Sequence, residues 1–287
     1  IKVFLNHNFL NIQDSELVVY SSAISPDNPE LIAAREKGIP VVMRAKVLAE
    51  LMNEKVGIAI SGAHGKTTTS SMAALLLKES SLNPTVAVGG VVKNFSNNAL
   101  LGEGNFFVIE ADESDGSFLY YRPFYSIITN IDKEHLDYYR NIDEIIEAYA
   151  KFADNTKKGG KLICFGQDKN IKKMLKCINK KYIVYGLDKS MDIYADDIKL
   201  ERLGSSFNCF FKNKPLGRFF LNIPGIHNVL NSLAVIGIGI ELRIDLNLIK
   251  SALLKFDGTE RRFQIKLELE GITVIDDYAH HPSEIQS

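Results

Sequence analysis

The 287-residue sequence has no tryptophan, few cysteines and almost no net charge. Cys164, Cys177 and Cys209 are dispersed, so they indicate neither a disulfide framework nor a zinc site, and we expect a reducing, cytoplasmic location. The longest apolar run, residues 233–240, is too short to span a bilayer. A net charge of −1 gives no reason to expect nucleic acid or an anionic membrane as a partner.

The two ends of the sequence both look interrupted. Ile1 begins within what reads as a domain, and Ser287 ends just as a new helical pattern starts. We therefore expect a piece of a longer protein, with one large domain or two modest ones between the ends.

The sequence is organised around a glycine turn within residues 56–69. An apolar, β-branched start predicts a buried parallel strand, and the Thr/Ser/Ala/Leu-rich stretch through Leu77 predicts a helix. The turn between them uses Gly62 and Gly65, with the spacing G-x-x-G-K-T, which is tighter than the common phosphate loop. Such a turn at a helix N-terminus is typical of phosphate sites, because its N–H groups and the helix dipole face the anion. An ordinary strand–helix turn with a chance lysine is the alternative.

A second candidate site lies at residues 106–115, where four apolar residues predict a buried strand. Four acids follow within six positions: Glu110, Asp112, Glu113 and Asp115. So dense a group of carboxylates is stabilised where a divalent cation neutralises it. Phosphoryl-transfer enzymes hold Mg²⁺ between a loop Ser/Thr and a carboxylate at the tip of a neighbouring strand. A solvated acidic loop is the alternative.

Histidines accompany most of the remaining motifs. His135 lies among acids after the strand predicted at 125–130, where it is either a metal or phosphate contact or a structural residue. Asn228, beside His227, precedes a long apolar helix and fits an N-cap. The strand at 272–275 ends in a cluster of acids, Tyr278 and the adjacent pair at 280–281.

Other segments complete the expected organisation. Residues 1–54 alternate strand and helix, 143–152 form an amphipathic helix, and 182–223 are β-rich. The lysine-rich helix at 169–181 reads as a solvated face. Arg261 and Arg262 suit bidentate phosphate recognition, with an ion pair to Glu260 as the alternative.

Taken together, these motifs resemble the Mur ligases of peptidoglycan synthesis. The resemblance rests on residues 62–69, 110–119, 129–137, 225–231, 261–263 and 276–282, which follow the family's order over nearly the whole chain. The run at 114–118 resembles the branch that adds L-alanine rather than the branch that recycles murein peptides. Ala63 departs from the family, which usually has Thr there; backbone N–H contacts would survive this change, whereas a hydroxyl contact would not.

The resemblance implies an α/β fold with a P-loop-type central ATPase domain built on a parallel sheet. Partial Rossmann-like domains flank it. We expect an N-terminal UDP-substrate domain at 1–54, the ATP-binding domain at 55–263 and the start of a C-terminal ligase domain at 264–287.

The resemblance also implies an activity: ATP-dependent joining of L-alanine to UDP-N-acetylmuramate in the cytoplasm, through an acyl phosphate. ATP and Mg²⁺ are the implied cofactors. The residues expected to cradle the ATP phosphates are Gly62, Ala63, His64, Gly65, Lys66, Thr67 and Thr68. Thr67 and Glu113 would hold Mg²⁺, and His135 would hold a second metal or the transferring phosphoryl group.

The same resemblance assigns catalytic roles to Lys66, Glu113, His135 and Arg262. Lys66 would contact the β- and γ-phosphate oxygens, and Arg262 would clamp the γ-phosphate. The resemblance further implies that Asn228 faces the adenine, and that Asp277 and Tyr278 reach ATP from the third domain.

Three alternatives stay open at this point. The chain could bind nucleotide without ligating, which is our expectation if most of the third domain is missing, since that domain would close the site against water. It could belong to the murein-peptide recycling branch. It could be another P-loop NTPase or kinase, in which case phosphate release would need no amino acid.

Overall fold

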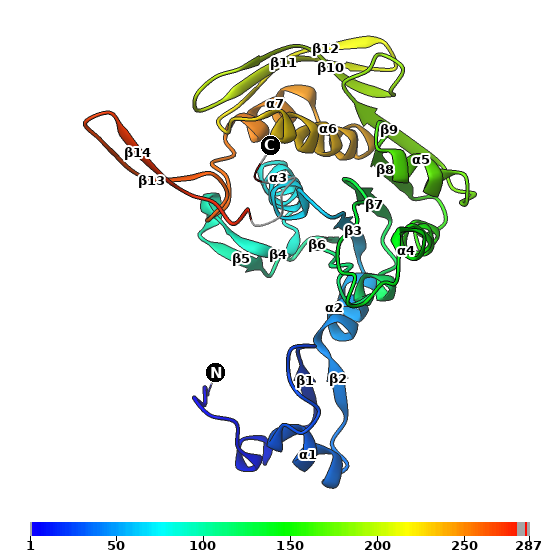
Figure 1. Ribbon diagram of the computed structural model, residues 1–287, viewed down its shortest axis with the longest axis vertical. Coiled ribbons are helices and arrows are strands. Elements are labelled where there is room, and N and C mark those ends of the chain that lie inside the picture. The colour runs from blue at the N-terminus through cyan, green and yellow to red at the C-terminus, as the bar shows by residue number, and fades with distance from the viewer. Residues whose placement is uncertain (1, 280–284, 286–287) are drawn as a thin grey trace.

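The computed structural model describes residues 2–279 and Ile285. The pair at 280–281 that the sequence singled out lies outside the described residues. Figure 1 shows a small N-terminal lobe joined through helix α2 to a larger body. No helix among the described residues is both long and apolar enough to cross a membrane.

The N-terminal lobe is a short βαβα unit. Its elements are η1 (Phe9–Ile12), β1 (Val18–Tyr20), α1 (Pro29–Glu36), β2 (Val41–Met43) and α2 (Arg44–Asn53). Strands β1 and β2 pair in parallel, as expected for two strands joined by a helix. Helix α1 begins at Pro29 because the Asn28 side chain accepts a hydrogen bond from the Glu30 N–H. The alternation predicted from the sequence is confirmed.

The larger body is built on a sheet of ten strands in the order β12-β11-β10-β9-β8-β7-β3-β6-β4-β5. The strands are β3 (Val56–Ser61), β4 (Thr85–Val92), β5 (Asn97–Leu100), β6 (Phe106–Glu110), β7 (Tyr125–Ile128), β8 (Lys161–Phe165), β9 (Tyr182–Gly186), β10 (Ile193–Leu200), β11 (Ser205–Phe211) and β12 (Lys214–Leu221). Strands β4 and β6 to β10 pair in parallel around β3. At the two ends of the sheet, β5 pairs antiparallel with β4, and β11 pairs antiparallel with both β10 and β12. The predicted α/β class and parallel sheet are confirmed.

Helices cover both faces of this sheet. The remaining elements are η2 (Lys93–Phe95), α3 (Lys66–Glu79), η3 (Ser117–Tyr120), α4 (Ile142–Asp154), α5 (Lys169–Leu175), α6 (Ile226–Glu241) and α7 (Leu246–Leu254), followed by the hairpin β13 (Gln264–Leu269) and β14 (Ile272–Asp276). Helices α3, α6 and α7 share one apolar core with the sheet. Helices α2, α4 and α5 share the core on the opposite face. Each large side chain buried in these cores, such as Phe152 or Phe219, contributes about 1.5–3 kcal/mol through removal from water.

Strand β3 is central because its residues are apolar on both faces. Ile58, Ala59 and Ile60 are fully buried, with β6 on one side and β7 on the other. Helix α3, which follows β3, is buried on most of its surface between the sheet and helices α6 and α7. The turn between β3 and α3 therefore joins two elements that are both packed against neighbours on several sides.

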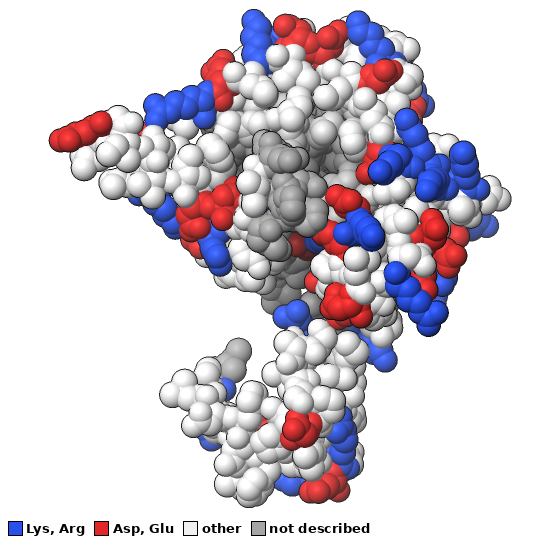
Figure 2. All heavy atoms as spheres, in the orientation of Figure 1, with Lys and Arg blue, Asp and Glu red and all other residues white. Residues whose placement is uncertain are grey.

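Charge is mixed on the surface. In the face drawn in Figure 2, acidic and basic side chains are interspersed, and the densest basic group lies beside α5. Exposed lysines on α5, including Lys172 and Lys173, lack interleaved aromatic residues. This arrangement fits the solvated face predicted for the helix.

Candidate active site

The turn between β3 and α3 depends on two glycines with positive φ. Gly62 has φ +141° and Gly65, which caps the N-terminus of α3, has φ +80°. A Cβ at Gly65 would lie 2.6 Å from Asn231 Oδ1, and one at Gly62 would collide with Thr129. The first N–H groups of a helix have no intrahelical partner, so this turn presents free donors at the positive end of the helix dipole. The predicted strand, turn and helix are confirmed.

Lys66, the first residue of α3, joins a buried cluster of charges. Its Nζ donates to Glu113 Oε1 at 2.9 Å and to the carbonyl oxygens of Gly62 and Ala63 at 2.7 and 3.3 Å. Glu113 is 2 % exposed, and its Oε1 also lies 3.3 Å from His135 Nε2. The structure thus brings together three of the residues predicted to be catalytic.

The cluster shifts the titration of its members. Burial works against the charge of Glu113, but hydrogen bonding from His135 and the positive charge of Lys66 outweigh it and lower the Glu113 pKa. The hydrogen bond to Glu113 raises the pKa of His135, although burial opposes the rise. Burial opposes the charge of Lys66 as well, yet the neighbouring Glu113 raises the Lys66 pKa. Lys66 and Glu113 therefore stabilise one another as ions.

Thr67 faces a different carboxylate from the one the sequence suggested. Its Oγ1 donates to Glu110 Oε1 at 3.0 Å, and Glu110 Oε2 accepts from the Gly89 N–H at 2.7 Å. Burial raises the Glu110 pKa, and the hydrogen bond from Gly89 offsets only part of that rise. A cation beside Thr67 and Glu110 would stabilise the carboxylate charge that burial disfavours.

The sequence contained a clue that singles out Glu110 from the acidic run. Glu110 is the last residue of β6, so it shares a face of the sheet with Val108. Val108 packs in the core that contains α3, whereas Phe107 and Ile109 pack in the opposite core. Strand alternation therefore directs Glu110 toward the start of α3.

Three side chains form a second place where a cation could bind. Asp112, Glu113 and His135 each offer a ligand atom, and these atoms lie within 4.8 Å of one another. Glu134 extends the cluster, because its carboxylate lies 3.8 Å from His135 Nε2 and 3.6 Å from His64 Nε2. Carboxylate and imidazole ligands suit a divalent ion. Thr67 and His135 thus belong to two neighbouring groups of potential ligands.

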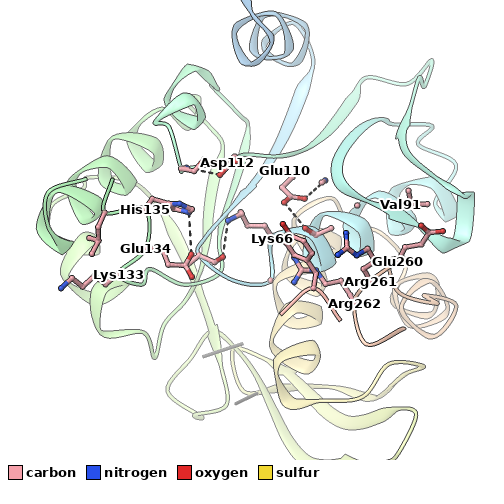
Figure 3. Close-up of a pocket in the computed structure, with 18 residues that line it drawn as sticks. Lys66, Val91, Glu110, Asp112, Lys133, Glu134, His135, Glu260, Arg261 and Arg262 are labelled. Carbon is pink, nitrogen blue, oxygen red and sulfur yellow. Dashed lines mark hydrogen bonds and ion pairs between the residues drawn. The ribbon is translucent and has the colours of Figure 1, made fainter. Parts of the chain in front are cut away.

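Most members of these groups line a cavity of about 980 Å³ that runs along the carboxyl ends of β3 and β6, whereas the buried Glu113 is not part of its lining. Figure 3 shows Lys66 between the group containing His135 and Glu134 and the group containing Glu110 and the arginines. Predicted residues in the cavity lining are Ala63, Gly65, Lys66, Thr67, His135, Arg262 and Tyr278. Glu260 and Arg261 line it too.

A second cavity of about 550 Å³ lies on the other side of the glycine turn. Its lining includes the predicted residues His64, Gly65, Thr67, Thr68, Asn228, Arg262 and Asp277. Gly65, Thr67 and Arg262 line both cavities. An elongated ligand could therefore extend from one cavity to the other across the turn.

Asn228 lies in the second cavity but does not cap α6, so the predicted N-cap is wrong. The helix begins one turn earlier, at Ile226, after Gly225 with φ +99°. Asn228 instead donates through Nδ2 to the Pro224 carbonyl at 2.6 Å, and its Oδ1 accepts from Asn231 at 3.4 Å. A glycine with positive φ starts this helix without a capping side chain.

Arg262 lies at the border of the two cavities, and Tyr278 lines the larger one. The guanidinium carbons of Arg261 and Arg262 lie 4.9 and 5.4 Å from the centre of the Tyr278 ring, which are cation–π distances. Asp277 Oδ2 accepts from the Phe263 N–H at 2.8 Å, which joins the end of β14 to the start of β13. The structure thus gathers the predicted residues of the C-terminal segment beside the turn.

The family of the chain follows from comparison with known proteins. The Mur ligase middle domain matches residues 60–239, and the Mur ligase family catalytic domain matches residues 1–56. The chain belongs to the Mur ligase family, which confirms the resemblance inferred from the motifs.

Particular relatives are similar over the whole chain. The UDP-N-acetylmuramate–L-alanine ligase of Desulfatibacillum aliphaticivorans is 46% identical over 99% of this chain and 62% of its own length. The crystal structure of the UDP-N-acetylmuramate-alanine ligase MurC of Thermotoga maritima has a TM-score of 0.88 and 33% identity, covering 100% of this chain and 65% of that one. The murein peptide ligase of Psychrobacter arcticus shares the fold, with a TM-score of 0.80 and 24% identity, covering 98% of this chain and 64% of that one. The chain thus spans about 62% of the length of the curated relative.

Proposed function

We propose that this chain carries the nucleotide site of an ATP-dependent ligase that joins L-alanine to UDP-N-acetylmuramate. The proposal rests on the family, on the names of the similar ligases and on the arrangement of side chains around the glycine turn. ATP would phosphorylate the substrate carboxylate, because a carboxylate oxygen is a poor leaving group. The amine of L-alanine would then displace phosphate from the acyl phosphate.

The glycine turn would bind the nucleotide phosphates. The N-terminus of α3 supplies N–H donors. Lys66 supplies a positive charge, which its hydrogen bond to Glu113 holds beside the turn. The second cavity, with Asn228 in its lining, would take the nucleoside. The terminal phosphate would then lie in the larger cavity beside Arg262.

Mg²⁺ fits the donor set on this side of the turn. Thr67 Oγ1 and the half-buried Glu110 carboxylate would hold the ion that accompanies the nucleotide, with Glu110 taking the place first given to Glu113. Asp112, Glu113 and His135 would hold a second ion. When bound, Mg²⁺ would neutralise charge on the transferring phosphoryl group.

One observation carries the proposal: Lys66, Thr67 and their carboxylate partners surround a glycine turn at the centre of the sheet. The test measures ADP release from Mg-ATP in the presence of UDP-N-acetylmuramate, with and without L-alanine. We expect any ADP release to require both substrates. ADP release without any amino acid would instead identify an NTPase, and dependence on a murein peptide in place of L-alanine would identify the recycling branch.

Nucleotide binding is measured separately from ligation. We expect the chain to bind Mg-ADP, because the residues assigned to the phosphates lie within it. If Mg-ADP binds but no amino acid supports ADP release, the nucleotide site stands and the assignment of L-alanine ligation to this chain falls. If Mg-ADP does not bind, the proposal fails as a whole.

A further inference from the structure

Asn130 bridges the two polar groups of a single residue in the glycine turn. Its Oδ1 accepts a hydrogen bond from the His64 N–H at 2.8 Å, and its Nδ2 donates to the His64 carbonyl at 2.9 Å. An amide side chain can serve both groups at once because it carries a donor and an acceptor. Asn130 therefore fixes the orientation of the turn at His64.

Neighbouring groups strengthen this attachment. Thr129 Oγ1 donates to the same His64 carbonyl at 2.6 Å, and the Asn130 carbonyl accepts from the Ala63 N–H at 3.4 Å. A side chain at Gly62 would collide with Thr129, so glycine allows the two segments to approach. The residues directly after β7 thus hold the turn along one side.

The segment after Asn130 is fixed in turn by the start of α5. The Ile131 N–H donates to Asp168 Oδ2 at 3.3 Å, and its carbonyl accepts from Asn170 Nδ2 at 2.7 Å. Asn170 is buried, and four residues after Ile131 the chain reaches His135. The glycine turn and the His135 segment are consequently attached to one framework, with Asn130 at the junction.

The contacts at His64 decide which N–H groups of the turn remain for an anion. The N–H groups of Ala63 and His64 already have acceptors on Asn130, so they cannot also donate along the same direction to a phosphate. The donors left for the nucleotide are those at the start of α3, from Gly65 to Thr68. Their direction depends on the position of the His64 peptide.

We propose that Asn130 is a positioning residue that aligns the N–H groups of Gly65 to Thr68 with the nucleotide phosphates. This inference rests on the proposed nucleotide site and goes beyond it by assigning a residue that acts through the turn. Asn130 also lines the second cavity, so a direct contact with the nucleoside is the competing explanation. The two explanations differ in which part of the nucleotide they affect.

The test compares ADP with AMP, which lacks the β-phosphate. Each is titrated against a fluorescent ADP analogue bound to the wild-type chain and to Asn130→Ala. Two hydrogen bonds to the turn are lost, so we expect ADP affinity to fall on the order of tenfold or more. AMP affinity should change less than about threefold, because its single phosphate makes fewer contacts with the turn.

Asn53 supplies a matched control for loss of an amide bridge. Asn53 is the last residue of α2 and lines neither cavity; its Oδ1 accepts from the Arg122 N–H at 2.8 Å and its Nδ2 donates to the Tyr120 carbonyl at 3.3 Å. Asn53→Ala removes the same kind of bridge, so it should lower the melting temperature without changing the ratio of ADP to AMP affinity. If Asn130→Ala does not fold, Thr129→Val removes one bond to His64 and should shift the ratio in the same direction by a smaller factor.

Several results would overturn the inference. Unchanged ADP affinity in Asn130→Ala, or in Thr129→Val if only that variant folds, would show that the turn is aligned without this bridge. Equal losses for ADP and AMP would show that Asn130 contacts the nucleoside. Absence of ADP binding to the wild-type chain would instead reject the proposed nucleotide site, and this inference with it.

Discussion

At the scale of single residues, two carboxylates near the turn are distinguished by their partners. Glu113 is paired with Lys66 and His135, and its pKa is lowered despite burial. Glu110 faces Thr67 and Gly89, and burial raises its pKa. We therefore propose that Glu113 positions Lys66 and contributes to the second cation site, whereas Glu110 binds the cation that accompanies the nucleotide.

Thr67→Val tests the assignment of the cation. The substitution keeps the shape of the side chain but removes the hydroxyl that faces Glu110. We expect ADP affinity to lose most of its dependence on Mg²⁺, whereas Thr67→Ser should retain it because serine keeps the hydroxyl. Titrations with ADP at fixed ionic strength, with and without Mg²⁺, measure the effect. An unchanged Mg²⁺ dependence in Thr67→Val would place the ion elsewhere.

Glu113→Gln tests the buried charge cluster through the pH dependence of stability. The lowered pKa of Glu113 means that its contribution is present above the ordinary value of about 4.5 and is lost as pH falls through the folded-state pKa. The raised pKa of His135 means that its contribution is complete below about 6.5 and is lost as pH rises through its folded-state pKa. The two contributions therefore coincide between about pH 4.5 and 6.5.

We expect Glu113→Gln to lower the free energy of unfolding by about 3–5 kcal/mol in that window, as for breaking a buried ion pair. Above it the difference should shrink as His135 loses its proton, with the part due to Lys66 remaining. Urea unfolding of both proteins from pH 4 to pH 9 measures the difference. A difference independent of pH would contradict the coupling of Glu113 to His135.

The predictions for single residues succeeded where a residue's position depends only on its neighbours in the sequence. Lys66 and Thr67 follow a glycine turn, so their position at a helix N-terminus could be read directly. The sequence did not show which acid faces Thr67. That depends on which face of β6 packs against α3 and on the residue at which β6 ends. From the sequence, Asn130 was only the end of a predicted strand and part of the resembling segment 129–137. Its role could not be predicted, because its bonds to His64 link segments 66 residues apart.

At the scale of elements, the β3–α3 unit combines a buried strand with a helix whose start is held by tertiary contacts. The sequence predicted both elements because their composition and the glycines between them agree. The sequence-based prediction misplaced the start of α6, because asparagine is in general a better N-cap than glycine and therefore favoured Asn228 over Gly225. A glycine at φ +99° and the preceding proline begin that helix instead.

Gly65→Ala tests how strongly the turn depends on glycine. The new Cβ would meet both an unfavourable φ of +80° and the Asn231 side chain. Gly38→Ala is the matched control, since φ there is +69° and nothing lies within 4 Å. We expect Gly38→Ala to lose about 1–2 kcal/mol of unfolding free energy from backbone strain alone. Its affinity for ADP should not change.

Gly65→Ala should lose more stability than Gly38→Ala and bind ADP on the order of tenfold more weakly, because the turn must shift away from Asn231. Thermal unfolding and ADP titration of both variants measure these effects. Equal stability losses together with unchanged ADP affinity would show that the turn tolerates a side chain at this position.

At the scale of the whole molecule, the ten-stranded sheet brings distant segments to one edge. Strands β3, β6 and β7 are neighbours, so their carboxyl ends place the glycine turn, the acidic run and the His135 segment together. Helix α6 and the β13–β14 hairpin enclose the second cavity from another side. Strand order could not be read from the sequence, because it depends on pairings between residues far apart in the chain.

The central claim is that this assembled edge binds nucleotide phosphates through Lys66. Calorimetric titration with Mg-ADP of the wild-type chain and of Lys66→Met, which keeps the length of the side chain without its charge, tests the claim most directly. The account predicts one ADP per wild-type chain and at least about tenfold weaker binding by Lys66→Met. Equal affinities for the two proteins would contradict it.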